Sequence, residues 1–244
     1  MLSPQHKEFN NILKDLARSR HMISVFRDFL EMSHIALANS VYLQTDIGQE
    51  MEARYFESIK QYSKEELEQF SKLLALTAIA LQESSHDFLG QVFMANDMGN
   101  EYRGQFFTPY HISQMMTQII FTGYDDIIKE KGYISMQEPT CGSGGMVIAC
   151  AETLHASGYD VSKTMWAEAR DIDSLCFMMT YIQLSVLGVP ARVVQGNTLT
   201  LEENRVLYTP AFIANGWFDR LGDAPVNNAW APEQIEQFKN GTLC

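Results

Sequence analysis

The sequence contains few cysteines, and their spacing does not indicate a disulfide framework. Cys141, Cys150, Cys176 and Cys244 include no Cys-x-x-Cys pair, so we expect reduced thiols and no metal site. No uninterrupted apolar run reaches the roughly 20 residues of a membrane-spanning helix. The first residues also lack the basic and apolar segments of a secretory signal. These absences predict a cytoplasmic globular protein.

The sequence also lacks positive charge. The net charge is −12; residues 1–132 carry 18 acids against 12 bases, and residues 133–244 carry 12 acids against 6 bases. A protein that grips duplex DNA unaided usually presents a basic face, because contacts to phosphates supply much of the affinity. We interpret the one local group of bases, Lys14, Arg18, Arg20 and Arg27, as a solvated helix face. If the chain acts on DNA, we expect a partner to supply much of the grip.

The first hundred residues predict a helical N-terminal domain (1–100). Ser3-Pro4 is a helix start signal, with a capping residue followed by proline at the first helical position. Gly48 is expected to interrupt the pattern, with a second helix at residues 49–61. Ser63 and Glu66 form a capping box for a third helix. Asp87 leads into a short helix, and the apolar positions of this domain are assigned to packing alone.

After Gly99 the pattern changes to short apolar runs that alternate with helices. Pro109 starts a helix, and strands are expected at residues 133–137, 163–167, 191–194 and 211–214. Helices are expected at residues 146–154 and 172–187, the second ended by Gly188. This alternation is typical of an α/β fold with a parallel sheet and right-handed crossovers. We therefore predict a second domain at residues 101–244.

A glycine-rich segment, Glu-Pro-Thr-Cys-Gly-Ser-Gly-Gly at 138–145, lies between a predicted strand and a predicted helix. Ligands of such sheets bind beyond the carboxyl ends of the strands, where this segment is expected to lie. Val147 stands where a dinucleotide loop needs its third glycine, and no Gly-Lys-Ser/Thr follows for a phosphate loop. Glu138 would repel a pyrophosphate but suits a cationic ligand. S-adenosylmethionine, which carries an ammonium and a sulfonium, is such a ligand.

Polar residues after the next two predicted strands are further candidates. Glu168 is expected to accept hydrogen bonds from the ribose hydroxyls of a bound nucleoside; alternatively it only ends a strand. Asp171 is expected to cap the following helix. Asn197 either bonds to the adenine of the cofactor or makes a turn, and the sequence leaves both open.

Four segments together resemble the methylation subunit of type I restriction–modification systems and related adenine-N6 DNA methyltransferases. They are the acid-headed glycine segment at 138–145, Gly-Gln-Phe-Phe-Thr-Pro at 104–109, Gly-Asn-Thr-Leu at 196–199 and Asp-Phe-Leu-Gly at 87–90. The resemblance covers roughly residues 85–220 and implies a Rossmann-like methyltransferase sheet that binds S-adenosylmethionine. It implies cofactor contacts at Phe107 and Thr108 for the methionine part, Glu138, Cys141, Gly142 and Gly144 for the amino-acid end, Glu168 for the ribose and Asn197 for the adenine.

The sequence departs from this family where the methyl acceptor should bind. The family's Asn/Asp-Pro-Pro-Tyr/Phe holds adenine by its amine and stacks on it; here the best candidate is Asn215-Gly216-Trp217-Phe218. Asn215 and Phe218 are the candidate catalytic residues, although glycine frees a backbone that proline would fix. Alternatively this stretch is a turn, with Trp217 in the core or facing a partner.

Few residues follow this stretch, so the sheet is expected to be shortened, with an edge that self-association or a larger protein covers. Two functions remain open. One is an adenine-N6 DNA methyltransferase that acts with a specificity subunit or another protein. The other is a catalytically inactive accessory protein of a restriction–modification or mobile-element system.

Overall fold

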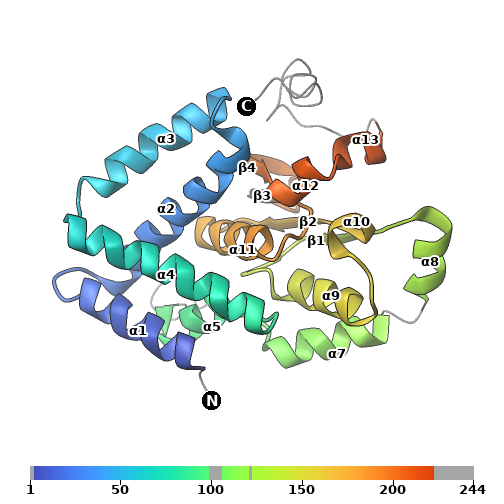
Figure 1. Ribbon diagram of the computed structural model, residues 1–244, viewed down its shortest axis with the longest axis horizontal. Coiled ribbons are helices and arrows are strands. Elements are labelled where there is room, and N and C mark those ends of the chain that lie inside the picture. The colour runs from blue at the N-terminus through green and yellow to red at the C-terminus, as the bar shows by residue number, and fades with distance from the viewer. Residues whose placement is uncertain (1–2, 99–105, 121–122, 223–244) are drawn as a thin grey trace.

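The computed structural model describes residues 3–98, 106–120 and 123–222, with N-terminal helices packed beside a small sheet and its own helices (Figure 1). The N-terminal helices are α1 (Pro4–Leu16), α2 (Met22–Tyr42), α3 (Asp46–Ile59), α4 (Lys64–Glu83) and α5 (Phe88–Ala95). Two predicted starts are confirmed: the Ser3 side chain accepts from His6 N, and Ser63 and Glu66 form the reciprocal capping box of α4.

Gly48 does not interrupt the helical pattern, and that prediction is wrong. It lies in the first turn of α3, whose cap is Thr45; the Thr45 hydroxyl accepts from Gly48 N at 3.1 Å. A Cβ at position 48 would come within 1.8 Å of the carbonyl oxygen of Tyr42. The glycine is therefore needed for the close approach of α3 to the end of α2.

The sheet has four strands in the order β1-β2-β3-β4. They are β1 (Ile134–Glu138), β2 (Met165–Asp171), β3 (Ala191–Asn197) and β4 (Glu202–Tyr208). The first three are parallel, and β4 runs antiparallel to β3. The helices that follow residue 105 are α7 (Tyr110–Ile120), α8 (Tyr124–Lys131), α9 (Gly145–Ala156), α10 (Val161–Thr164), α11 (Ser174–Val186), α12 (Pro210–Ala214) and α13 (Trp217–Leu221). The α/β class is confirmed.

The fourth strand corrects the sequence prediction. Residues 211–214, expected as a strand, lie in α12, because Thr209 and Pro210 provide a cap position and a first-turn proline. The fourth strand comes from residues 202–208 instead and forms a hairpin with β3. Its first five residues, Glu-Glu-Asn-Arg-Val, are exposed or half-buried, so the apolar run that signals a buried strand is absent.

The N-terminal helices and the sheet share one apolar core. α11 lies at its centre: ten of its 13 residues are buried, since α2, α4 and α5 pack on one side and β2 and β3 on the other. Tyr42 of α2 reaches the sheet, where its hydroxyl accepts from Tyr208 N at 2.7 Å. The expected domain boundary at residues 100–101 falls outside the described residues, and the division into two domains stays a prediction. Among the described helices, none is both long enough and apolar enough to cross a bilayer.

Candidate functional site

The glycine turn lies where the sequence predicts it, beyond the carboxyl end of β1. β1 ends at Glu138 and α9 begins at Gly145, with Gly144 as its cap residue. Gly142 and Gly144 have φ angles of 55° and 92°, which non-glycine residues rarely adopt. A Cβ at position 142 would lie 2.9 Å from the Phe107 ring. The turn therefore needs glycine for its dihedral angles and for the close packing of Phe107.

Hydrogen bonds hold the turn against β2 and α11. Cys141 N donates to Arg170 O at 2.8 Å, and Gly142 N donates to the Asp171 carboxylate at 2.9 Å. The Thr180 hydroxyl donates to Gly142 O at 3.0 Å. The Cys141 thiol is buried beside Thr180, and burial raises its pKa, so it stays protonated. Cys141 thus contributes through its place in the turn rather than as a reactive thiol.

Two carboxylates meet at this edge because β1 and β2 are parallel neighbours. Glu138 ends β1, opposite Ala169 of β2, and Asp171 ends β2 two residues later. Burial raises the pKa of the Glu138 carboxyl above its ordinary value, and the nearby Asp171 charge raises it further. Burial also raises the pKa of Asp171, although hydrogen bonds from Asp173 N and Gly142 N oppose this. In the described residues neither acid has a basic side chain within ion-pair distance, so a bound cation would favour both ionised forms.

A cleft of about 290 Å³ opens beside this turn. Its wall brings together five of the residues predicted to bind the cofactor: Phe107, Thr108, Glu138, Cys141 and Gly142. Gly144 closes the same turn without lining the cleft, and a Cβ at this position would lie 3.2 Å from the Thr180 hydroxyl. Gly104 and Gln105, the first residues of the segment before α7, lie outside the described residues.

Glu168 is not at the cleft. It lies three residues before the end of β2, where its carboxylate pairs with Arg192 at 2.7 Å and with Arg170 at 3.5 Å. Glu203 of β4 pairs with both arginines at 2.6 Å and closes a ring of four charges. The carboxylate at the strand end is that of Asp171. Asp171 is not the helix cap, which corrects the sequence interpretation; Asp173 caps α11 by accepting from Leu175 N.

Asn197 ends β3 and makes a turn. Its side-chain oxygen accepts from Leu199 N at 2.9 Å and from Thr200 N at 3.3 Å. The next residue, Thr198, donates its hydroxyl hydrogen bond to Pro139 O and so ties this turn to the glycine turn. The sequence leaves two interpretations of Asn197 open, and the structure contains the turn. A contact between Asn197 and adenine stays a prediction.

Asn215 and Phe218 lie at the opposite end of the sheet from the glycine turn. β4 runs antiparallel and returns the chain to the start of β3, where Thr209 N donates to Ala191 O at 2.9 Å. Asn215 follows the last residue of α12 and donates its side-chain hydrogen bond to Ala211 O at 2.8 Å. Phe218 packs with its ring centroid 4.8 Å from that of Tyr208. The sequence predicts that Asn215 and Phe218 follow a parallel strand and lie at its carboxyl end. The structure corrects that position and does not bring these residues to the cleft.

Sequence reasoning missed the part that Asp87 and Gln183 play in holding the turn. Asp87 is buried, and its carboxylate accepts from the Ser143 hydroxyl at 2.5 Å, from Gln183 Nε2 at 2.9 Å and from Gly90 N at 3.0 Å. Gln183 Nε2 also lies 2.8 Å from Ser143 O. Burial raises the pKa of Asp87, and the hydrogen bonds from Gln183 and Ser143 oppose that rise. These contacts, which we call the Asp87 clamp, join α5, the glycine turn and α11.

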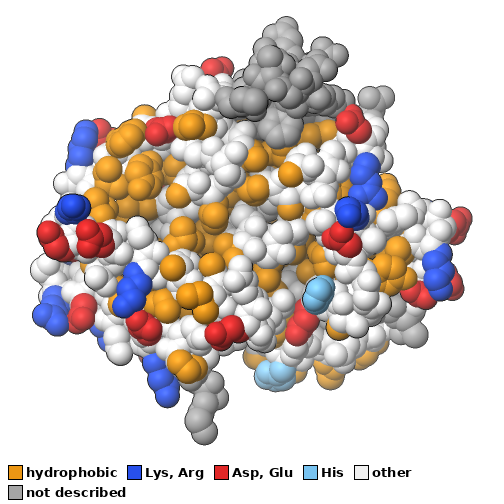
Figure 2. All heavy atoms as spheres, viewed as in Figure 1, with side chains coloured by type: hydrophobic (Ala, Val, Ile, Leu, Met, Phe, Trp, Pro, Cys, Tyr) orange, Lys and Arg blue, Asp and Glu red, His pale blue; other side chains and the backbone are white. Residues whose placement is uncertain are grey.

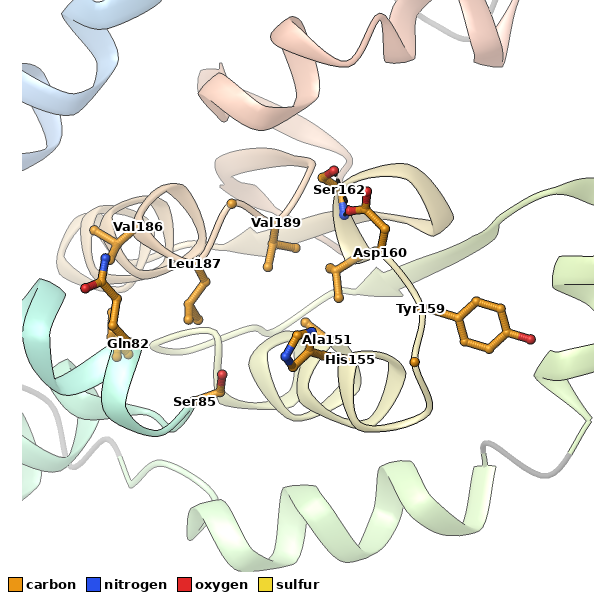
Figure 3. Close-up of a pocket in the computed structure, with 14 residues that line it drawn as sticks. Gln82, Ser85, Ala151, His155, Tyr159, Asp160, Ser162, Val186, Leu187 and Val189 are labelled. Carbon is orange, nitrogen blue, oxygen red and sulfur yellow. Dashed lines mark hydrogen bonds between the residues drawn. The ribbon is translucent and has the colours of Figure 1, made fainter.

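A larger pocket of about 690 Å³ lies at the other end of the sheet. Figure 3 shows Gln82, His155 and Val186 around it, from the last turns of α4, α9 and α11. Val189, also in its wall, lies two residues before the start of β3. The pocket therefore lies by the amino ends of the parallel strands, and it contains none of the predicted cofactor or catalytic residues.

The group of bases near the N-terminus is partly neutralised by acids. Arg18 pairs with Asp15 at 2.8 Å, and Arg20 pairs with Glu66 at 2.6 Å while it stacks on Tyr62. On the face drawn in Figure 2, acidic and basic side chains are interspersed, and neither sign gathers into a patch. The four bases do not share one helix face, which corrects the sequence interpretation: Lys14 lies on α1, Arg27 on α2, and Arg18 and Arg20 in the segment between them.

Residues 85–237 match the family model described as N-6 DNA Methylase. The match covers more than half of the chain and includes the Asp87 clamp, the glycine turn and the two strand-end acids, Glu138 and Asp171. A comparison with curated proteins found no match.

We predict that Asp87→Ala destabilises the fold by about 2–4 kcal/mol, because it leaves buried hydrogen-bond donors of Ser143, Gln183 and Gly90 without an acceptor. Asp87→Asn is the matched control: its oxygen can still accept from Gln183 and Gly90, and its amide can donate to Ser143. Urea unfolding followed by circular dichroism measures both. Equal losses for the two variants would contradict the clamp.

Proposed function

The chain belongs to the N-6 DNA methylase family, and we propose that its cleft binds S-adenosylmethionine for methyl transfer to adenine in DNA. The observation that carries this proposal is the pair of half-buried carboxylates, Glu138 and Asp171, at the ends of neighbouring parallel strands beside a glycine turn. Two acids that lack a basic partner among the described residues suit a ligand with a positive charge at one end. A nucleotide phosphate would meet repulsion at the same place.

S-adenosylmethionine supplies an activated methyl group on its sulfonium. Glu138 would bind its ammonium, and the backbone of the glycine turn would pack against the methionine part. Asp171 would accept hydrogen bonds from the ribose hydroxyls, since it occupies the strand end at which nucleoside-binding sheets hold the ribose. We assign this role to Asp171 rather than Glu168, because Glu168 is already paired with Arg170 and Arg192. Phe107 and Thr108 would close the cleft over the methionine part.

The identity of the methyl acceptor, adenine in DNA, is proposed from the family match and not from the residues of the cleft. Methylation of adenine requires a base that leaves the duplex and stacks in a pocket, with acceptors for its amine. The net charge of −12 disfavours an unaided grip on DNA. We therefore propose that DNA binds with a partner, such as a specificity subunit, that supplies basic surface.

A second candidate function is a cofactor-binding accessory protein without methyl transfer. The observation that favours it is the place of Asn215 and Phe218, at the opposite end of the sheet from the proposed cofactor. In the described residues, no Asn-Pro-Pro-Tyr/Phe segment takes their place. The two functions share the cleft and differ in whether the methyl group is transferred.

We predict that Glu138→Gln and Asp171→Asn each weaken S-adenosylmethionine binding about 10-fold or more, because each removes a charge-assisted contact. Titration calorimetry measures the affinity. Glu168→Gln is the control: it disturbs the ring of charges and lowers stability, but leaves the affinity within about 3-fold. Weaker binding in Glu168→Gln alone would restore Glu168 as the ribose ligand. A wild-type protein that releases no heat and shows no binding in equilibrium dialysis would refute the cofactor proposal.

The affinity for S-adenosylmethionine should also depend on pH. The pKa values of Glu138 and Asp171 are raised in the free protein, and only the ionised carboxylates attract the cation. Binding is therefore strongest above the raised pKa values and weakens as the pH falls through them, at a higher pH than for ordinary carboxyls. Calorimetry from about pH 8 to about pH 5 tests this. Glu138→Gln should show a shallower dependence, and an equally steep one would assign the effect to other groups.

Transfer of a labelled methyl group to DNA of mixed sequence distinguishes the two functions. We expect label in adenine when the partner that grips DNA is present, and the same amount with Asn215→Ala, since Asn215 lies far from the cleft. Loss of label in Asn215→Ala, with stability unchanged, would contradict its placement. A protein that binds the cofactor but transfers no label would support the accessory function.

A further inference from the structure

Helix α7 carries its apolar side chains on the outside. Met115, Met116, Ile119 and Ile120 are 52%, 39%, 68% and 57% exposed, whereas Ser113 and Thr117 are buried. With the half-buried Ile112, these four residues form what we call the α7 face. Figure 1 places α7 at the lower right of the molecule, and Figure 2 shows hydrophobic side chains reaching the surface there. A contiguous apolar surface of this kind marks an interaction site.

The inner side of α7 explains why its apolar side points outward. α7 packs against α9 through polar groups: the Tyr110 hydroxyl and Gln114 both donate to Glu152, at 2.8 and 2.9 Å, and the Thr117 hydroxyl lies 3.3 Å from that of Thr153. Turning α7 over would bury four large apolar side chains at the cost of these hydrogen bonds. The orientation is therefore fixed by specific contacts, and the apolar row faces outward.

The chemistry of the α7 face indicates which molecule that is. Residues 110–120 contain no Asp, Glu, Lys or Arg, although the whole chain carries a net charge of −12. A basic partner would be recognised by acidic side chains, which α7 lacks. A second copy of this acidic chain, in contrast, needs a contact where like charges do not meet. We propose that the α7 face is the contact between two copies of this chain.

The spacing along α7 suits such a contact. Ile112, Met115 or Met116, and Ile119 follow each other at intervals of three or four residues, so they form one stripe along the helix. Two identical stripes can pack against each other across a twofold axis, with the helices antiparallel and the central Met115 residues near the axis. Each copy then buries the apolar row of the other.

The contact also reaches the cleft. Met116 lines the same cleft as Glu138, together with Phe106, which is 71% exposed. A second copy seated on α7 would cover this wall and shield the cofactor from water, so binding of the cofactor and pairing of the copies should strengthen each other. This step rests on the proposed function, whereas the pairing itself does not.

Sedimentation equilibrium of the full chain without cofactor tests the pairing alone. We expect a dimer whose dissociation constant rises about 30-fold or more with Met115→Asp. Ile79→Asp is the matched control, because Ile79 is a similarly exposed residue (46%) on α4, and it should leave the constant unchanged. A monomer at all concentrations, or equal effects of the two substitutions, would overturn the proposal.

Thiol cross-linking identifies what covers the α7 face. In a Cys244→Ser background, whose other cysteines are buried, the thiol introduced by Met115→Cys should form a disulfide between two chains under mild oxidation. The thiol introduced by Ile79→Cys should not. With Cys244 restored, a disulfide within one chain instead of between two would show that the chain's own last residues cover α7, which would refute the pairing. Adding S-adenosylmethionine should then tighten the dimer, and a dimer that the cofactor leaves unchanged would refute the coupling.

Discussion

The candidate site depends on one buried carboxylate. Asp87 holds Ser143 of the glycine turn and Gln183 of α11 at once, so the turn is fixed between the N-terminal helices and the sheet. No Cβ fits at Gly90, because it would lie 2.1 Å from the Asp87 carboxylate and 2.3 Å from the Ser143 hydroxyl. A turn that contains two glycines is flexible on its own. Here that flexibility is removed by contacts from outside the turn, which makes the N-terminal helices part of the site.

The parts of the site that the sequence predicts are those whose cause is local. The glycine turn follows from adjacent residues, and so do the caps at Ser3 and Ser63. The parts that the sequence does not predict depend on contacts between residues that are far apart in the chain. Asp87 and Gln183 are 96 residues apart, and β4 is a strand only because it pairs with β3. The sequence predicts the end of β2 four residues too early, because the charged residues Glu168 and Arg170 are typical of an exposed segment. In the structure their ion pairs with Arg192 and Glu203 allow both residues to lie inside the strand.

Ion pairing separates the carboxylates of this sheet into two kinds. Glu168 and Glu203 are paired with Arg170 and Arg192, so their charges are already compensated within the fold. Glu138 and Asp171 are also partly buried, but in the described structure backbone N–H groups are their only hydrogen-bond donors. Burial of an acid without a countercharge is unfavourable. Acids of this second kind, at the carboxyl ends of parallel strands, offer a cationic ligand the largest electrostatic contribution to binding. The sequence alone does not distinguish them from the ion-paired acids.

The same charges set opposite requirements for the two substrates of a DNA methylase. In the proposed function the acidic cleft would attract the cationic methyl donor and would repel the phosphates of the nucleic acid that must approach it. A single chain usually resolves this conflict with a basic surface around the cleft, and the described residues beside it, on α7 and the segment before it, are apolar or uncharged. The proposed function therefore assigns the cofactor to this chain and the affinity for DNA to a second surface. On the proposed function the two binding steps are therefore separable, with the cofactor bound by the chain and DNA bound by its assembly with a partner.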